Sequence, residues 1–343
     1  MHRLIGLTVG AALTATCLWA AAPVIAAESA VIVLYHRFGE NTHPSTNIRI
    51  DQFEAHLAEL AKPKYTVLPL PEIVARLRAK KPLPERTVGI SIDDAFVSVY
   101  REAYPRLKKA GMPFTLFVAT KPVDQRVGGY MSWEHIRELK QAGVTIGSQT
   151  HTHLHMAKSS TDQNRSELET SNRLFREELG EAPAIIAYPY GEYSLAVGQV
   201  AKETGFTVGF GQHSGVLHPE ADMLYLPRFA MNENFGGESR FRLAINALPI
   251  KVGEVSPQDP LLGPETNPPI LGFTVLGEAA KRLSQLACYA SDQGIARLER
   301  LGSRVEVRLD TAFSPGRTRI NCTMLTRSGR WRWYGLQFYV PRG

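Results

Sequence analysis

Cysteine is scarce in this chain, with 3 among 343 residues, and no pair has the close spacing of a cysteine-based metal motif. Lysine and arginine form no extended run, and the formal net charge is only +6. Nucleic acid is therefore not an expected partner, and the mild basicity suits the anionic surface of a cell envelope better. An apolar content of 44% allows one large core and a smaller second one.

Charge is almost absent from the first 27 residues, where Arg3 is the one ionised side chain. Residues 4–22 are nearly unbroken Leu, Ile, Val, Ala, Gly and Thr, and Val24-Ile25-Ala26-Ala27 offers small residues for cleavage before Glu28. The pattern predicts a signal peptide over 1–27 and export to the periplasm or beyond the cell. An uncleaved membrane anchor is the alternative.

The two cysteines outside that segment are Cys288 and Cys322. Because an exported protein folds in an oxidising compartment, a lone pair of this kind predicts a disulfide.

The pattern from residue 31 alternates strands and helices. Strands are expected at 31–35, 65–68, 87–92, 113–118, 144–146, 185–187 and 206–210, and helices at 51–61, 71–80, 97–110, 132–142, 162–179 and 195–204. Repeated βα units of this size build a parallel sheet, either as a barrel or as a doubly wound sheet. In a parallel barrel the loops after the strands carry the chemistry. Four of these loops hold unusual residues: Tyr35-His36-Arg37, Asp93-Asp94, residues 149–155, and Tyr188-Pro189-Tyr190-Gly191.

The composition changes after residue 247. Residues 249–269 hold six prolines and few apolar side chains, which predicts a linker. A helix at 279–287 and strands at 304–309, 318–324 and 330–340 are expected beyond it. The predicted organisation is a large α/β unit over 28–248, a linker over 249–269, and a small α+β domain over 270–343.

Two groups of polar residues in these loops predict a metal site. Asp93 and Asp94 close an apolar strand, where adjacent carboxylates are costly unless they share a cation or a proton. Residues 149–155 hold three of the ten histidines, again just after a strand. Two histidines and one carboxylate are a ligand set for a catalytic divalent ion with an open position. A solvated polar loop is the alternative for either group alone.

Ser91-Ile92-Asp93-Asp94, the histidine cluster and Tyr188-Pro189-Tyr190-Gly191, in this order and spacing, resemble the polysaccharide deacetylases of carbohydrate esterase family 4, the NodB-homology domain. The resemblance covers about residues 31 to 235. It implies a distorted (β/α) barrel, a divalent metal that is commonly zinc, and N-deacetylation of an N-acetylated polysaccharide. Chitin-like chains, peptidoglycan and poly-N-acetylglucosamine are the substrates of the family, and no obligate protein partner is implied.

Carried over residue by residue, the resemblance implies that Asp93 is the general base and Asp94 the metal-binding carboxylate. The backbone N–H of Tyr190 would form part of the oxyanion site.

The histidine motif of the family, His-[Ser/Thr]-x-x-His, fits this chain in two registers. The literal match is His151 to His155, whereas the distance from the preceding strand favours Gln149 and His153. In the second register His153 is a ligand, and His151 and His155 compete with Gln149 for the remaining position.

Two residues of the family pattern are absent. The arginine that normally precedes Pro-Tyr is replaced by Ala187-Tyr188, and no histidine follows His218. Arg228 is the candidate to orient Asp93, with a surface ion pair as the alternative. His36 is the candidate general acid, with a structural strand-end histidine as the alternative. The Tyr-His-Arg opening resembles the branch of the family that acts on exported biofilm-type polysaccharides.

These departures keep two other functions open. One is a catalytically inactive glycan-binding protein on the same fold. The other is an O-acetyl esterase, because water activated in this way attacks esters more easily than amides.

Overall fold

The computed structural model describes residues 2, 26–291 and 293–342, so the predicted signal peptide lies outside the described residues except for His2, Ala26 and Ala27. Within the described part, no helix combines the length and the apolar character needed to cross a membrane.

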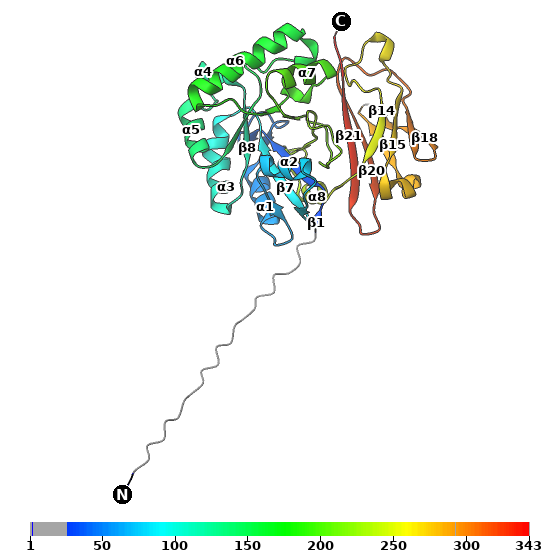
Figure 1. Ribbon diagram of the computed structural model, residues 1–343, viewed down its shortest axis with the longest axis horizontal. Helices are drawn as coiled ribbons and strands as arrows, with labels where there is room; N and C mark the ends of the chain where they lie inside the picture. Colours follow the sequence, from blue (N-terminus) through cyan, green and yellow to red (C-terminus); the bar gives the residue numbers. More distant parts are fainter. Residues whose placement is uncertain (1, 3–25, 292, 343) are drawn as a thin grey trace.

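A curled parallel sheet forms the centre of the larger unit (Figure 1). Its strand order is β11-β10-β9-β8-β7-β2-β12, with β5 paired to β7, and every pairing is parallel. The strands are β2 (Ala30–Tyr35), β5 (Thr66–Val67), β7 (Thr87–Ile92), β8 (Thr115–Val118), β9 (Thr145–Ser148), β10 (Ile185–Ala187), β11 (Val208–Phe210) and β12 (Phe229–Ala230). The sheet is therefore an open, distorted barrel, as the sequence predicts.

The central strands are buried along their whole length, which is why they are almost continuously apolar. All six residues of β2 and all six of β7 are buried. A parallel strand covered on both faces needs this composition rather than alternation.

Helices surround the barrel (Figure 1). They are α1 (Ile50–Leu60), α2 (Leu70–Arg78), α3 (Tyr104–Ala110), α4 (Thr120–Asp124), α5 (Trp133–Gln141), α6 (Thr161–Leu179), α7 (Leu195–Glu203) and α8 (Glu238–Ile245). Short strand pairs β1 (Ala26–Ala27) with β6 (Leu83–Pro84), and β3 (Arg37–Phe38) with β4 (Asn47–Ile48), lie outside the main sheet. The helix expected at 97–110 begins instead with a π-helical turn over Val99–Ala103.

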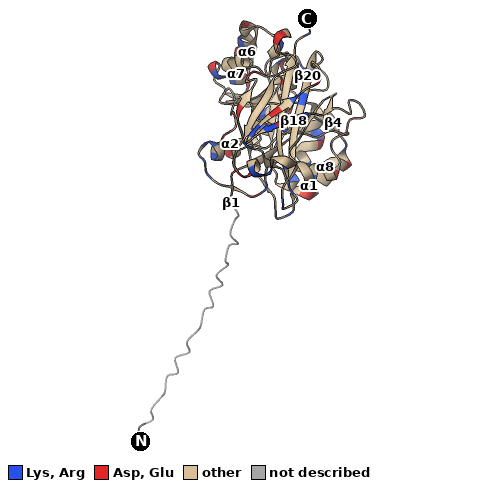
Figure 2. Cartoon of the chain, turned by 90° about the vertical axis from the view of Figure 1, so that its right-hand side faces the viewer, with Lys and Arg blue, Asp and Glu red and all other residues tan. Residues whose placement is uncertain are grey.

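The C-terminal unit, residues 248–342, consists of two antiparallel sheets beside the barrel, apart from the short parallel strand β13 (Figure 1). One has the order β13-β21-β20-β16-β17 and the other β14-β15-β19-β18. The strands are β13 (Leu248–Pro249), β14 (Val252–Ser256), β15 (Leu271–Val275), β16 (Ala287–Ala290), β17 (Gly294–Ile295), β18 (Arg297–Leu301), β19 (Arg304–Arg308), β20 (Gly316–Leu325) and β21 (Trp331–Val340). The predicted Cys288–Cys322 disulfide is present and joins β16 to β20. Basic and acidic residues occur together on the sheet that carries β18 (Figure 2), and Arg308 and Glu299 form an ion pair there.

Two features of this unit correct the predictions from composition. The segment 249–269, predicted as a linker, contains β14, because Val252 and Val255 pack against the second hydrophobic core. The helix expected at 279–287 is a kinked 3-10 helix over Gly277–Gln285, followed at once by β16. The C-terminal unit thus has 3-10 rather than α-helical turns beside its strands.

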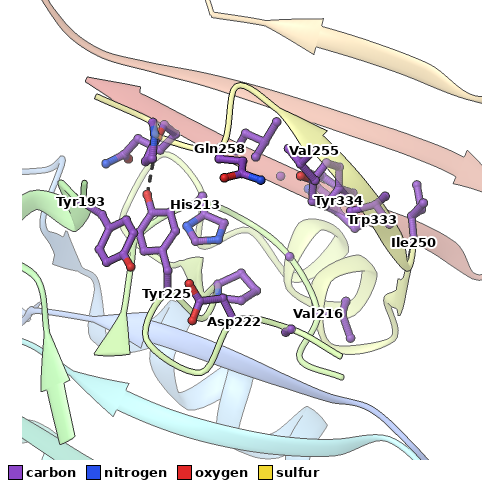
Figure 3. Close-up of a pocket in the computed structure, with 18 of the residues that line it drawn as sticks. Tyr193, His213, Val216, Asp222, Tyr225, Ile250, Val255, Gln258, Trp333 and Tyr334 are labelled. Carbon is purple, nitrogen blue, oxygen red and sulfur yellow. Dashed lines mark hydrogen bonds between the residues drawn. The ribbon is translucent and has the colours of Figure 1, made fainter. Parts of the chain in front are cut away.

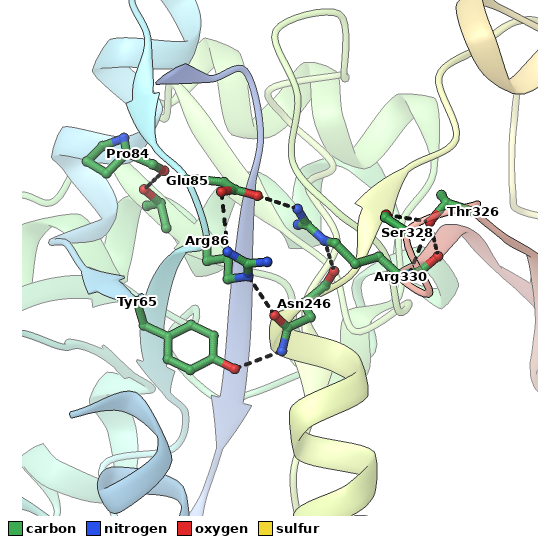
Figure 4. A network of polar contacts seen from close by, with 9 residues as sticks. Tyr65, Pro84, Glu85, Arg86, Asn246, Thr326, Ser328 and Arg330 are labelled. Atoms are coloured by element: carbon green, nitrogen blue, oxygen red, sulfur yellow. Dashed lines mark hydrogen bonds and ion pairs between the residues drawn. The ribbon is translucent and has the colours of Figure 1, made fainter. Parts of the chain in front are cut away.

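Direct contacts dock the C-terminal unit against the barrel. The indole of Trp333 meets the ring of Phe229 edge-on, with centroids 5.3 Å apart. Nearby, Arg330 pairs with Glu85 at 2.8 Å and donates from Nε to the Asn246 carbonyl at 2.8 Å (Figure 4). Both apolar and charged contacts therefore connect the two units.

Candidate active site

Asp93 directly follows β7, at the carboxyl end of a central strand, and is fully buried. Both of its carboxylate oxygens accept hydrogen bonds from Arg228, Nη1 to Oδ1 at 2.7 Å and Nη2 to Oδ2 at 2.9 Å. The backbone N–H of Asp93 donates to the carbonyl of Tyr35 on the neighbouring strand at 2.9 Å. A bidentate pair of this kind fixes geometry as well as charge. The carboxylate is held in one orientation.

Arg228 lies just before β12 and has no exposed surface, so it is not a surface residue. Two further donors are also used, with Nε bonded to the Gly211 carbonyl at 2.9 Å and Nη1 3.3 Å from Ser91 Oγ. Arg228 leads into β12, which is separated from β7 by β2 alone in the sheet, so the two side chains meet although they are 135 positions apart in the sequence.

Asp94 has a left-handed backbone, φ 74°, which turns its side chain away from that of Asp93. Its Oδ1 atom is buried and has no hydrogen-bond partner among the described residues. Burial tends to raise the pKa of this carboxyl, but the imidazole of His153 and the charges of His36 and Arg37 bring the pKa below its ordinary value. Asp94 is thus an anionic oxygen donor with an unused lone pair.

The loop after β9 brings Gln149 and His153 to Asp94. The Gln149 Oε1 atom accepts the backbone N–H of Asp94 at 2.9 Å, and Nε2 of His153 lies 3.3 Å from Asp94 Oδ1. Thr150 and His153 both adopt positive φ, 67° and 61°, which folds the loop back over the strand end. The two residues beside Asp94 are those of the register that keeps the distance from the strand.

His151 and His155 bond to other partners. The Nδ1 atom of His151 lies 2.9 Å from Thr120 Oγ1, and Nδ1 of His155 lies 2.9 Å from a carboxylate oxygen of Glu192. The ring of His155 also stacks on Tyr190 with centroids 4.1 Å apart. The structure therefore does not gather the three histidines around Asp94.

His36 follows β2 and is half-buried. Because β2 and β7 are parallel neighbours, His36 lies at the same edge of the sheet as the two aspartates that follow β7. The adjacent Arg37 stacks over Phe96, 3.4 Å from the ring centroid, and pairs with Glu40 at 2.8 Å.

Tyr190 is the centre of a strained turn, Pro189–Gly191, after β10. Its φ of 59° is unusual for a residue with a side chain. Burial raises the pKa of the Tyr190 phenol, and the charges of Asp94 and Glu192 raise it further. Its ring meets His153 edge-on at 4.5 Å as well as stacking on His155. Tyr190 therefore already has a ring stacked on one face, which leaves less of it for a sugar.

A cleft of about 450 Å³ opens over these residues. It is lined by Asp94, Ala119, Lys121, Pro122, Gln125, Val127, Tyr130, Thr152, His153 and Tyr190. Its size falls in the range typical of small-ligand pockets, about 300–1,000 Å³. One acidic oxygen, one imidazole and two tyrosine rings thus face a space that can hold one unit of a polymer.

The donors at the base of this cleft fit a divalent ion in part. Asp94 Oδ1 accepts no hydrogen bond from the described residues, and Nε2 of His153 lies 3.3 Å from it. Two ligands of one cation can have this separation. The Nε2 amide atom of Gln149 is also buried without a partner. Among the described residues, no three His, Cys, Asp or Glu side chains are grouped as a metal site. The side-chain oxygen of Gln149, which accepts the backbone N–H of Asp94 at 2.9 Å, is a neutral oxygen donor close to Asp94.

The sequence did not single out several residues that hold this site together. Glu167 accepts hydrogen bonds from the backbone N–H groups of His151 and Thr152, at 3.1 and 2.7 Å. Glu192 is buried and pairs with His155. The sequence offers no local signal for either glutamate, because their hydrogen bonds depend on tertiary contacts.

Comparison with known proteins finds one matching family model and several similar proteins. Residues 80–209 match the family described as Polysaccharide deacetylase. The Bacillus subtilis (strain 168) protein YxkH is 29% identical over 208 residues, which are 61% of this chain and 73% of that protein. A Staphylococcus aureus protein, poly-beta-1,6-N-acetyl-D-glucosamine N-deacetylase, is 27% identical over 195 residues, 53% of this chain and 67% of its own.

Solved structures share the barrel. The Streptococcus pyogenes deacetylase PplD in complex with acetate has a TM-score of 0.59 at 22% identity, covering 63% of this chain and 98% of that one. IcaB from Ammonifex degensii has a TM-score of 0.55 at 24% identity, covering 62% and 96%. At these identities, both similarities show a shared fold only.

Proposed function

We propose that this chain removes N-acetyl groups from a polysaccharide that contains N-acetylglucosamine, because its residues 80–209 match the family described as Polysaccharide deacetylase. The relative named as acting on poly-β-1,6-N-acetylglucosamine supports this substrate class. The observation that carries the proposal is the buried Asp93–Arg228 pair beside the unpartnered Oδ1 atom of Asp94, since one carboxylate is held for proton transfer and the other is left for a cation.

We assign the cation site to Asp94 and His153, with Gln149 as a candidate third donor. A divalent ion held there, zinc being the common one in this family, would act as a Lewis acid that makes water more acidic. The amide of Gln149 is a neutral donor, so we expect weaker metal retention than an additional histidine would give.

Asp93 is the proposed general base. Each carboxylate oxygen has two lone pairs, so the two bonds from Arg228 leave one on each oxygen to accept a proton from water. Arg228 fixes the direction of that lone pair and is the charge partner of the buried carboxylate. A correctly placed base of this type contributes about 10²- to 10⁴-fold to the rate.

The remaining roles belong to Tyr190 and His36. The backbone N–H of Tyr190 would stabilise the negative charge that develops on the acetyl oxygen during attack. His36 would protonate the amine as the C–N bond breaks, so that acetate and a free amino group are the products. His151 and His155 act in this proposal as supports of the loop rather than as ligands.

We also propose that the protein works outside the cytoplasm. The Cys288–Cys322 disulfide supports this location, because such bonds persist in oxidising compartments. Cell fractionation followed by N-terminal sequencing tests it: a mature protein that starts at Glu28 in the exported fraction is expected, and an intact chain in the membrane would indicate an uncleaved anchor.

Acetate release from an N-acetylglucosamine polymer tests the activity. We expect release by the wild-type protein, loss of release in chelator with recovery on adding Zn²⁺, and a fall of roughly 100-fold or more in Asp93→Asn. Asp124→Asn, at an exposed position on α4, is the matched control.

The same assay separates the other candidate functions. Glycan binding without acetate release in any metal would indicate an inactive binding protein. Faster release from an O-acetylated polymer than from the N-acetylated one would indicate an esterase.

A further inference from the structure

Two side chains of the C-terminal unit reach the Pro189–Gly191 turn. We propose that Gln337 and Arg317 are positioning residues that hold this turn, and with it the Tyr190 N–H, in the geometry the reaction needs. The inference rests on the proposed function of the turn as part of the oxyanion site. It gives the C-terminal unit a role in the reaction that the barrel alone does not supply.

The backbone of the turn needs external support because it is strained. Tyr190 and Gly191 both have positive φ, 59° and 68°. A side chain on Gly191 would collide with the backbone nitrogen of Gln212, so this position tolerates no larger residue without movement. Strained backbone persists where the surrounding structure over-determines it.

The C-terminal unit supplies two bonds to one carbonyl group of this turn, that of Tyr190. Gln337, on β21, donates from Nε2 to the Tyr190 carbonyl at 3.1 Å, and Arg317, on β20, approaches the same oxygen at 3.5 Å. The amide orientation of Gln337 follows from its other bond, since its Oε1 accepts from Arg319 Nε at 3.0 Å. Gln337 is buried, so this bond is shielded from water.

These bonds fix the peptide plane that follows Tyr190. Its carbonyl is bonded to Gln337, and its N–H, which belongs to Gly191, donates to the Tyr188 carbonyl at 2.8 Å. The preceding peptide is anchored as well, because the Pro189 carbonyl accepts the N–H of Glu192 at 3.1 Å. In a trans peptide the N–H points opposite to the carbonyl, so anchoring the Pro189 carbonyl aims the Tyr190 N–H.

The ring of Tyr190 is held from the same side of the molecule. The guanidinium carbon of Arg317 lies 5.2 Å from the ring centroid, and its Nε is 3.8 Å from the carboxylate of Glu192. That carboxylate also binds His155, whose ring stacks on Tyr190. Arg317 therefore supports both the carbonyl and the ring of one residue.

A cavity of about 270 Å³ lies between the barrel and the C-terminal unit next to this turn (Figure 3). Tyr193, His213, Tyr225 and Gln337 are among the residues that line it. Tyr225 bonds through its hydroxyl to the Gly191 carbonyl at 3.2 Å. A cavity rather than packed side chains lies behind the turn. The bonds from Gln337 and Arg317 to the Tyr190 carbonyl are therefore the direct polar contacts between the C-terminal sheet and the turn.

Gln337→Glu is the sharpest variant. It keeps the size of the side chain and the acceptor for Arg319, but it loses the donor to Tyr190 and sets an oxygen against that carbonyl. Gln258→Glu is the matched control, because Gln258 lines the same cavity, is exposed and has no bond to the turn. Arg317→Met is a second, half-exposed variant that is expected to fold.

We expect kcat to fall roughly 10- to 100-fold in Gln337→Glu, with KM within about two-fold of wild type. The melting temperature should also fall, because the variant loses a hydrogen bond made by a buried side chain. In Arg317→Met, kcat should fall by a smaller factor than in Gln337→Glu. Hydrogen exchange of the Gly191 amide, which is independent of activity, should become at least about ten-fold faster in Gln337→Glu.

Unchanged Gly191 exchange and a kcat equal to that of Gln258→Glu would overturn the inference. If the wild-type protein releases no acetate, the proposed function fails, and the exchange experiment alone still decides whether Gln337 holds the turn.

Discussion

Asp93 and Arg228 are both fully buried, and each is the charge partner of the other. Removing one partner leaves an uncompensated charge in a dry site, which costs about 3–5 kcal/mol. We therefore expect Arg228→Met to lower the free energy of unfolding by that amount and to abolish acetate release. Urea unfolding at neutral pH measures it. Arg242→Met, which removes an exposed pair with Glu238, should cost under about 1 kcal/mol; equal losses in both variants would contradict this account.

His56 is a buried histidine away from the reaction, and it predicts a pH dependence of stability. Its Nδ1 lies 2.9 Å from the Tyr35 hydroxyl, its Nε2 lies 2.8 Å from the Gly236 carbonyl, and its ring stacks on Phe241 at 3.7 Å. Burial lowers the pKa of His56 from 6.5 to about 4, although the Gly236 carbonyl acts in the opposite direction. Between these two values the unfolded chain binds a proton that the folded chain does not, so stability falls as the pH falls.

The stabilising contribution of the neutral His56 is complete above pH 6.5 and is lost on acidification toward pH 4. Each pKa unit corresponds to about 1.4 kcal/mol, so about 3 kcal/mol is expected across this range. In His56→Gln the drop in unfolding free energy between pH 7.5 and 4 should be smaller by that amount, measured by denaturant titration at each pH. The exposed His43→Gln should keep the wild-type profile, and an unchanged profile in His56→Gln would count against the assignment.

At the residue scale, the sequence could predict that the acidic pair, the histidine loop and Tyr190 meet at one edge of the barrel, because all three follow parallel strands. It could not predict which histidine lies beside Asp94. That position depends on the positive φ of Thr150 and His153, which no local sequence pattern predicts.

At the scale of elements, two glycines end segments in the left-handed region but differ in their surroundings. Gly180 terminates α6 with φ 83°, and an added Cβ would meet no atom within 4 Å. Gly180→Ala should cost about 1–2 kcal/mol from backbone strain alone. Gly191→Ala adds a collision with Gln212, so we expect a further loss of at least about 1 kcal/mol and reduced acetate release. Thermal unfolding of both variants compares them, and equal stabilities would show that the turn can relax.

The strands and most helices of the barrel follow from apolar runs and from caps such as Ser132 and Gly180. The prediction of a linker over 249–269 was wrong because β14 is short and only half-buried, so its few valines give a weak strand pattern. The tertiary contact that makes it a strand, pairing with β15, cannot be derived from local composition.

At the scale of the whole molecule, the disulfide and the interface determine whether the C-terminal sheet can act on the barrel. Cys288 and Cys322 are 34 residues apart and tie β16 to β20, the strand that carries Arg317. Closing a loop of this length restricts the unfolded chain and typically stabilises by about 2–4 kcal/mol. The double variant Cys288→Ala/Cys322→Ala should lose that amount, mainly in the C-terminal unit.

Hydrogen exchange resolves where the loss falls. Amides of β20 should exchange faster in the double variant, whereas those of β7, in the barrel, serve as an internal control and should stay protected. Because Arg317 and Gln337 lie on the two strands that this sheet pairs, loosening β20 should also speed exchange at Gly191. Faster exchange in β20 with an unchanged Gly191 amide would mean that the barrel holds its own turn, and that the C-terminal unit is attached to the active site without controlling it.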